Sequence, residues 1–209
     1  MKKKLVLIGA GGYAKSVLDS VDEEQYEFCG FIDSFKPLGS EHLGYPILAC
    51  TVQEFAERDQ YCFFISIGNN AYRTEKFLAL QQLGCEVVNV IDKTALVSRH
   101  SRLGTGVFVG KMAIINSGVT VGDNVIINTK ALIEHGCHIG SHCNISTNTT
   151  LNGDVIVEDY AFVGSSSVVN GQLRVGENAM VGSGAVVIRN VEPRTVVAGV
   201  PAKFIKTYQ

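Results

Sequence analysis

The stretch ALIEHGCHIGSHCNISTNTTLNGDVIV, residues 131–157, has an aliphatic side chain at every sixth position. The same spacing continues in both directions, from Val97 to Val187, without an exception. Helices and ordinary strands have periods of 3.6 and 2 residues, so a period of six needs another structural cause. The sixteen positions are Val97, Leu103, Val109, Ile115, Val121, Ile127, Ile133, Ile139, Ile145, Leu151, Val157, Val163, Val169, Val175, Val181 and Val187.

A period of six with inward aliphatic residues is typical of a parallel β-helix. Two residues before each aliphatic position stands a mostly small or β-branched residue, and directly after it stands mostly Gly, Asn or Ser. We expect each hexapeptide to form one short strand, and the Gly, Asn or Ser position to take the unusual backbone angles of a corner. Stacked coils would bury a continuous core that no single repeat could bury alone.

The first 92 residues follow a different pattern, in which strands alternate with helices. We expect strands over residues 4–8, 28–32, 61–67 and 86–91. Helices are expected over residues 13–21, 51–58 (with Thr51 as N-cap) and 71–83, and a loop over 37–46. This alternation predicts βαβ units and a parallel sheet. The predicted fold is an α/β Rossmann-like half domain over residues 1–92, followed by a parallel β-helix with a C-terminal tail over residues 93–209.

Composition narrows the class of protein. With 18 basic and 20 acidic residues the net charge is −2, so no basic excess favours nucleic acid. The N-terminal run of four apolar residues before Gly9 is too short for an export signal or a membrane span, and indicates a buried strand. Six cysteines without a C-x-x-C pair predict reduced thiols. We therefore expect a cytoplasmic protein that binds neither nucleic acid nor membrane.

One corner of the predicted β-helix carries chemistry-bearing residues. Glu134 stands where small residues prevail, and His135 follows it directly. A bulky acid is a poor choice for a corner, and histidine is a credible general base near neutral pH. The alternative interpretation is an exposed Glu-His pair on a solvated corner.

The same stretch also raises the question of a metal site. His138 and His142 alternate with Cys137 and Cys143. The two cysteines occupy the inward position of consecutive repeats, so they lie on different faces of the β-helix. The histidines likewise project from different parts of a coil, whereas metal ligands must converge. We therefore predict no metal.

In the first 92 residues, a glycine turn follows a strand and opens a helix: Gly9-x-Gly11-Gly12-x-x-Lys15. Such a turn binds anions through backbone N–H groups, although the third glycine of the dinucleotide fingerprint is missing. Asp33 ends the next strand, where it could accept ribose or sugar hydroxyls. Gly68 ends the third strand on the same sheet edge. These residues predict a half-sized module that binds a nucleotide or a sugar. Of the possible ligands, NAD is the less favoured.

Taken together, these motifs resemble the sialic acid O-acetyltransferases of the NeuD family, within the hexapeptide-repeat (left-handed β-helix) acyltransferases. The resemblance covers nearly the whole chain. It rests on the start KKLVLIGAGG, GFID (30–33), IDKTA (91–95), LIEHG (132–136), NISTN (144–148), LNGD (151–154), VVNGQ (168–172) and AGVPAK (198–203).

The resemblance implies three hexapeptides per left-handed coil, hence about five coils, and a homotrimer with acetyl-CoA in clefts between subunits. It implies His135 as general base and the backbone N–H of Gly153 on the thioester oxygen. Glu134, the only acid adjacent to His135, is assigned a supporting role, the alternative being a solvated side chain. The positions that match acetyl-CoA contacts are Asn144, Ser165 and Ser183. The acceptor sugar would contact Gly11, Gly12, Tyr13, Asp33, Ser34 and Gly68 of the N-terminal domain.

Two departures bear on the acceptor. A sister branch, which acetylates the amine of nucleotide-linked amino sugars, has a carboxylate directly after the base and a histidine in the glycine turn. Here Gly136 and Tyr13 stand at those positions. We therefore predict an acetyl-CoA-dependent O-acetyltransferase acting on a hydroxyl of sialic acid, free or CMP-linked. The alternatives are an N-acetyltransferase of a UDP-linked amino sugar, a non-catalytic β-helix partner of a sugar biosynthetic enzyme, and a nicotinamide oxidoreductase.

Overall fold

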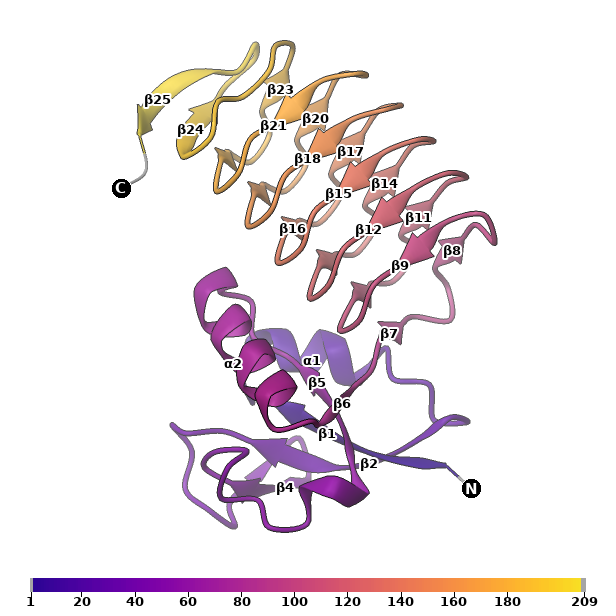
Figure 1. The fold of residues 1–209 in the computed structure, drawn as a ribbon, viewed down its shortest axis with the longest axis vertical. Coiled ribbons are helices and arrows are strands. Elements are labelled where there is room, and N and C mark those ends of the chain that lie inside the picture. Colours follow the sequence, from indigo (N-terminus) through magenta and orange to yellow (C-terminus); the bar gives the residue numbers. More distant parts are fainter. Residues whose placement is uncertain (1, 208–209) are drawn as a thin grey trace. The chain divides into compact units, whose positions relative to one another are not determined.

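The computed structural model describes residues 2–207, which form two compact units that divide between Ile91 and Asp92 (Figure 1). The N-terminal unit is a mixed α/β sheet domain. The C-terminal unit is a parallel β-solenoid built from two-residue strands. The fold class predicted from the sequence is therefore confirmed in both units.

The N-terminal sheet has six strands in the order β3-β4-β2-β1-β5-β6. All its pairs are parallel except β3–β4, which form an antiparallel hairpin. Residues 5–8 of the central strand β1 are buried, as expected for a parallel strand covered on both faces. The elements are β1 (Lys3–Ile8), α1 (Gly12–Leu18), β2 (Tyr26–Ile32), β3 (Glu41–His42), β4 (Tyr45–Ala49), the 3₁₀ helix η1 (Arg58–Gln60), β5 (Cys62–Ile65), α2 (Asn70–Gln82), β6 (Glu86–Val87) and, outside this sheet, β7 (Val90–Ile91).

Three details of the N-terminal prediction are wrong. Residues 51–58 form turns followed by η1 rather than a helix, although the Thr51 hydroxyl does accept a bond from the Glu54 amide, at 3.4 Å. Eight residues are too few for a helix to nucleate without tertiary support. The expected loop over 37–46 contains the β3–β4 hairpin, and the expected strand over 86–91 is broken into β6 and β7.

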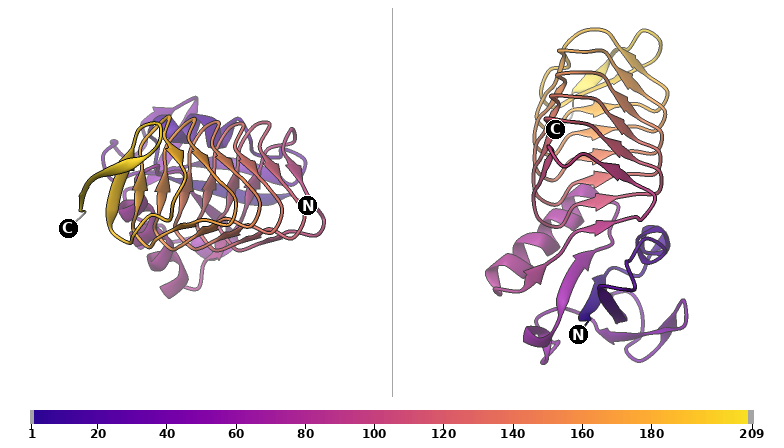
Figure 2. Two further views of the ribbon diagram at one scale, coloured as in Figure 1. Left: turned by 90° about the horizontal axis from the view of Figure 1, so that it is seen from above. Right: turned by 90° about the vertical axis from the view of Figure 1, so that its right-hand side faces the viewer.

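The β-solenoid has three faces, each a column of stacked strands (Figure 2). Strands β8 to β22 make five coils of three strands, and β23 and β24 continue the stack. The aliphatic residue of each repeat lies inside and forms one core with the small residues two positions earlier.

We name the columns by their strands. Face 1 holds β8 (Leu96–Val97), β11 (Ile114–Ile115), β14 (Leu132–Ile133), β17 (Thr150–Leu151), β20 (Val168–Val169) and β23 (Val186–Val187). Face 2 holds β9 (Arg102–Leu103), β12 (Thr120–Val121), β15 (His138–Ile139), β18 (Ile156–Val157) and β21 (Arg174–Val175). Face 3 includes β10 (Phe108–Val109), β13 (Ile126–Ile127), β16 (Asn144–Ile145), β19 (Phe162–Val163), β22 (Met180–Val181) and β24 (Thr195–Ala198), with β25 (Lys203–Thr207) antiparallel at its end.

The corners differ from the sequence prediction in one respect. From Leu103 to Val181, the left-handed backbone angles recur three residues after the aliphatic position, for instance at Asn124 (φ 56°), His142 (φ 62°) and Asp154 (φ 61°). Glycines directly after the aliphatic position do not have positive φ. Stacking requires them instead, because a Cβ on Gly122 would lie 2.7 Å from the Ser141 amide nitrogen on the next coil. The expectation about corner angles is therefore wrong by two residues.

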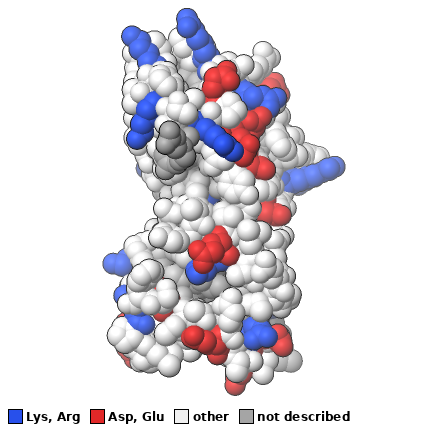
Figure 3. Space-filling model, turned by 60° about the vertical axis from the view of Figure 1, so that its left-hand side comes forward, with Lys and Arg blue, Asp and Glu red and all other residues white. Residues whose placement is uncertain are grey.

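The mixed surface charge and the free cysteines agree with what the composition predicts. Lys and Arg are interspersed with Asp and Glu on the face that Figure 3 shows. Among residues 2–207, no helix is long and apolar enough to span a membrane. The six cysteines are free, and Cys62, Cys137 and Cys143 are buried. Burial raises the pKa of Cys62 and of Cys137 to about 11, so both thiols stay neutral.

Candidate functional site

His135 lies at the corner between faces 1 and 2, two residues after strand β14. Its imidazole covers Gly153, which lies directly above it on the next coil. A Cβ on Gly153 would stand 2.5 Å from Cε1 and 2.8 Å from Nε2 of the ring. Only glycine leaves this space, so the residue that admits the imidazole is also the one predicted to offer a backbone N–H. The structure brings this predicted pair together.

Glu134 does not turn towards that imidazole. Its carboxylate oxygen Oε2 accepts a hydrogen bond of 3.1 Å from Nδ2 of Asn116, one coil below. Neighbouring residues of an extended segment point to opposite sides, which explains why Glu134 and His135 diverge. The bond to Asn116 holds Glu134 at the end of face 1. Eighteen residues separate these partners, so the coil period predicts their column but not their bond.

The positions predicted to contact acetyl-CoA lie elsewhere on the solenoid. Asn144 belongs to β16 of face 3 and is buried, with Oδ1 accepting a 3.2 Å bond from the Ser146 hydroxyl. Ser165 and Ser183 follow β19 and β22 and are stacked one coil apart at the corner between faces 3 and 1. In a single chain, therefore, the predicted base and the two serines occupy different corners.

The histidines and cysteines around this region do not form a metal site. Across residues 2–207, no three His, Cys, Asp or Glu side chains are placed to hold a metal ion. His138 lies on face 2, with Nδ1 2.6 Å from the Thr120 hydroxyl. His142 is buried and stacks on Tyr160, with ring centroids 4.9 Å apart. The structure thus gives both histidines other contacts.

The six predicted acceptor contacts line a single pocket of the N-terminal unit. Its volume is about 430 Å³. The pocket lies at the carboxyl ends of β1, β2 and β5, the general position of ligands in parallel sheets. The predicted residues in its wall are Gly11, Gly12, Tyr13, Asp33, Ser34 and Gly68.

Two hydrogen bonds to Asp33 fix the backbone around this pocket. The two carboxylate oxygens of Asp33 accept bonds from the Ala10 amide, at 2.7 Å, and the Phe35 amide, at 2.8 Å. Asp33 therefore holds both the glycine turn and its own loop in place. Burial raises the pKa of the Tyr13 phenol, so this side chain stays neutral.

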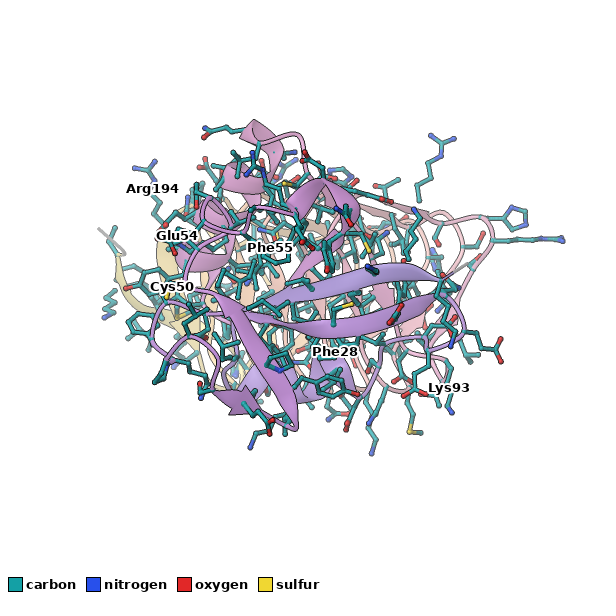
Figure 4. All side chains as sticks on the ribbon, turned by 90° about the horizontal axis from the view of Figure 1, so that it is seen from below. Phe28, Cys50, Glu54, Phe55, Lys93 and Arg194 are labelled. Atoms are coloured by element: carbon teal, nitrogen blue, oxygen red, sulfur yellow. The ribbon has the colours of Figure 1, made fainter. Side chains whose placement is uncertain are left out.

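Several pocket residues escaped the sequence analysis. The segment after β4 supplies Cys50 and Thr51, and helix α2 supplies Lys76. Figure 4 marks this segment by Cys50, Glu54 and Phe55. Because a helix was expected over 51–58, the sequence did not predict that this segment lines the pocket. No local pattern marks these residues, because their place depends on the packing of β4 beside β2.

Comparison with known proteins supports a single family. Residues 4–80 match the PglD N-terminal domain family. The chain is 32% identical to PerB from Caulobacter crescentus, crystallised with CoA and GDP-perosamine, over 97% of both chains with a TM-score of 0.91. A variant of perosamine N-acetyltransferase from the same bacterium, with the same ligands, is 30% identical over 97% of both chains, TM-score 0.91.

A third structure comes from another genus. The acetyltransferase domain of PglB from Neisseria gonorrhoeae, in complex with acetyl coenzyme A, is 29% identical, over 98% of this chain and 100% of that one, TM-score 0.91. The predicted co-substrate, acetyl-CoA, is thus bound in the structure of a relative. With this identity over nearly its full length, the chain belongs to the family of acetyltransferases that join a PglD N-terminal domain to a hexapeptide-repeat β-helix.

Proposed function

We propose that the protein transfers the acetyl group of acetyl-CoA to the amine of a nucleotide-linked amino sugar, with His135 as general base. The observation that carries this proposal is the imidazole seated on Gly153, with a Cβ there only 2.8 Å from Nε2. The similarity to an N-acetyltransferase crystallised with GDP-perosamine favours an amine over a hydroxyl. This replaces sialic acid as the first choice of acceptor.

The chemistry is direct acyl transfer. His135, as neutral imidazole, takes a proton from the acceptor amine while the nitrogen attacks the carbonyl carbon of the thioester. The tetrahedral intermediate then expels the sulfur of CoA, and the imidazolium returns the proton to it. The products are the acetamido sugar and CoA with a free thiol. His135 ends in its starting form, so the cycle needs no further reactant.

Gly153 supplies the second element of this mechanism. Its carbonyl oxygen accepts a bond from the Gln172 amide, at 2.9 Å, which fixes the peptide in the coil. Within residues 2–207 the Gly153 N–H donates to no acceptor, so it is available to an oxyanion. A well-placed donor of this kind contributes roughly 2.7–4 kcal/mol to transition-state stabilisation. The Glu134 carboxylate is held by Asn116, one coil below.

The N-terminal pocket is proposed to hold the nucleotide-sugar. Backbone groups of Gly11, Gly12 and Gly68 line it without side chains to obstruct a ligand. A Cβ on Gly11 or Gly12 would meet no atom within 4 Å, so both positions face open space. Ser34 and Asp33 add polar atoms at the same edge.

The separation of corners supports a homotrimer with acetyl-CoA between subunits. The proposed base lies between faces 1 and 2, whereas Asn144, Ser165 and Ser183 lie on face 3 or at its edge. A co-substrate held between two chains would contact the base of one chain and these residues of the next. Five of the six outward residues of face 1 are apolar, and of these Ile114, Leu132, Val168 and Val186 are half-buried in the single chain. Such a column is suited to packing against another copy.

A hydroxyl of sialic acid, free or CMP-linked, is the second candidate acceptor. It is favoured by Gly136, which places no carboxylate directly after the base, and by Tyr13 in the glycine turn. The base does not decide between the two, because an amine must also shed its proton.

The deciding test measures free thiol released from acetyl-CoA with three acceptors offered separately. These are a nucleotide-linked amino sugar such as GDP-perosamine, CMP-linked sialic acid, and free N-acetylneuraminic acid. Release with the amine alone is the expected result. Release only with a sialic acid would move the protein to the second candidate. A folded sample that releases thiol with none of them would contradict both and favour the non-catalytic interpretation.

Cys50 offers a separate test of the acceptor pocket. It is half-buried and lines the pocket, whereas Cys29 and Cys85 are half-buried and lie outside it. We expect saturating nucleotide-sugar to slow alkylation of Cys50 by iodoacetamide at least several-fold, measured by peptide mass spectrometry. Cys29 and Cys85 serve as internal controls and should react at unchanged rates. Equal protection of all three would indicate a general change in the protein, and no protection of Cys50 would place the acceptor elsewhere.

A further inference from the structure

The corner that carries His135 contains a second side chain that bridges two coils. Asp154 lies directly above Gly136, and a Cβ on Gly136 would stand 2.1 Å from Oδ1 and 3.2 Å from Cγ of Asp154. The carboxylate therefore fills the space that a side chain at position 136 would take. Gly136 also has a left-handed φ of 69°, so both geometry and space favour glycine there.

The side chains of these two neighbouring columns thus extend in opposite directions between the coils. The imidazole extends from residue 135 onto Gly153, and the carboxylate extends from residue 154 back onto Gly136. The coils are held in this register by the bond from the Asp154 amide to the His135 carbonyl, at 2.9 Å. The ring and the carboxylate consequently occupy adjacent columns between the same two coils.

We propose that Asp154 is a positioning residue for His135, supplying from the next coil the carboxylate that orients the imidazole and stabilises its protonated form during acyl transfer. The proposal rests on His135 acting as the base. Asp154 takes no proton itself. It faces the positive charge that His135 carries between accepting the proton and passing it to the leaving sulfur, the role that a carboxylate has beside a catalytic histidine.

A purely structural role fits Asp154 poorly, as comparison with two similar aspartates shows. Asp123 and Asp159 also fill the space above a glycine, but their carboxylates accept bonds of 2.7 Å from the amides of Thr105 and Ser141. These two aspartates fasten one coil to the next. Within residues 2–207 the Asp154 carboxylate makes no such hydrogen bond or ion pair. It is exposed at the corner, where substrate-free catalytic bonds are often long.

The other charged group near the ring has a different partner. On the coils directly below and above, the corner columns beside His135 hold Asn116, Ser117, Gly118, Asn152 and Gly153 in addition to Asp154. Glu134 is the remaining acid of this corner, and it is bonded to Asn116. From the sequence, Glu134 was expected to support the His135 base. The arrangement of the side chains assigns this role to Asp154.

The test compares Asp154→Asn with Asp159→Asn. Asparagine keeps the size of the side chain and tolerates the left-handed backbone of residue 154 (φ 61°). We expect Asp154→Asn to lower kcat about tenfold or more, a part of the 10²–10⁴-fold that a general base contributes. KM for acetyl-CoA and the melting temperature should be unchanged. The acidic limb of the pH–rate profile should move to lower pH, because the imidazolium loses its neighbouring charge.

Asp159→Asn is expected to keep the wild-type kcat and pH profile, whatever it does to stability. Glu134→Gln should lower kcat less than Asp154→Asn does. An Asp154→Asn enzyme with unaltered kcat and an unaltered acidic limb would overturn the proposal. Wild-type protein that turns over none of the offered acceptors counts instead against the proposed function. In that event NMR titration of the His135 ring still decides, because its midpoint must move to lower pH in Asp154→Asn if the carboxylate faces it.

Discussion

Replacing His135 with alanine is expected to lower kcat about 10²–10⁴-fold, the contribution typical of a general base. The acceptor must lose a proton as it attacks the thioester, and without the imidazole this proton passes to water. KM for acetyl-CoA should change little, because the proposed contacts Asn144, Ser165 and Ser183 lie away from this corner. His135 is exposed, so the melting temperature should stay near that of the wild type. Free-thiol release under saturating substrates measures the effect.

His138→Ala is the matched control. His138 is also an exposed histidine and lies only three residues away, but it belongs to face 2 and contacts Thr120. We expect this variant to retain most of the activity. A folded His135→Ala protein with nearly full acetyl transfer would contradict the proposed mechanism, and equal losses in both variants would point to a change in the coils rather than in the base.

The β-helix was predictable because its cause is local and repeated. Each hexapeptide brings its own inward aliphatic residue, so sixteen repeats predict the same strand independently. The number of coils also needs the three hexapeptides per coil that the family resemblance implies. The corners were less predictable, because two different demands select small residues. Gly122 is needed for close stacking, whereas Gly136 has a left-handed φ of 69°. The sequence shows glycine in both cases, and only the structure distinguishes close stacking from a left-handed backbone as the reason for it.

The N-terminal unit shows where local patterns fail. The hairpin between β3 and β4 turns at Leu43 and Gly44, which have φ values of 54° and 78°. Hairpins with two positive φ values usually carry Asn-Gly or Asp-Gly, so Leu-Gly gave no turn signal. Tertiary packing imposes the turn, since Ile47 of the following strand is buried beside β2. The pocket residue Cys50 was missed for the same reason.

The candidate site follows the same division. The coil period of eighteen residues places His135 beneath Gly153, and that pair was predicted. The period cannot tell which way a side chain leans, so the bond of Glu134 to Asn116 and the reach of Asp154 onto Gly136 were not predicted. Column membership follows from the period of six together with the three-repeat coil that the family resemblance implies, whereas side-chain direction depends on the neighbours above and below.

Replacing Gly153 with alanine should produce the second large effect, a fall in kcat of about 10²-fold. A methyl group there would stand 2.5 Å from Cε1 of His135, closer than atoms can approach, so the imidazole must swing off its position. A misplacement of about 1 Å costs this much in a catalytic geometry. The backbone need not change, because the φ of Gly153 is not positive and alanine retains the N–H. Folding, measured by circular dichroism and thermal melting, should therefore be close to that of the wild type.

A double-mutant cycle with His135→Ala identifies the atoms through which this effect acts. If the methyl group acts by displacing the ring, it should have little further effect once residue 135 is alanine, because no ring is left to displace. The combined variant should then resemble His135→Ala alone. A fall of equal size in both backgrounds would instead mean that the methyl group disturbs the N–H donor or the path of the substrate. The cycle thus separates an effect of the methyl group on the base from an effect on the oxyanion donor or on the path of the substrate.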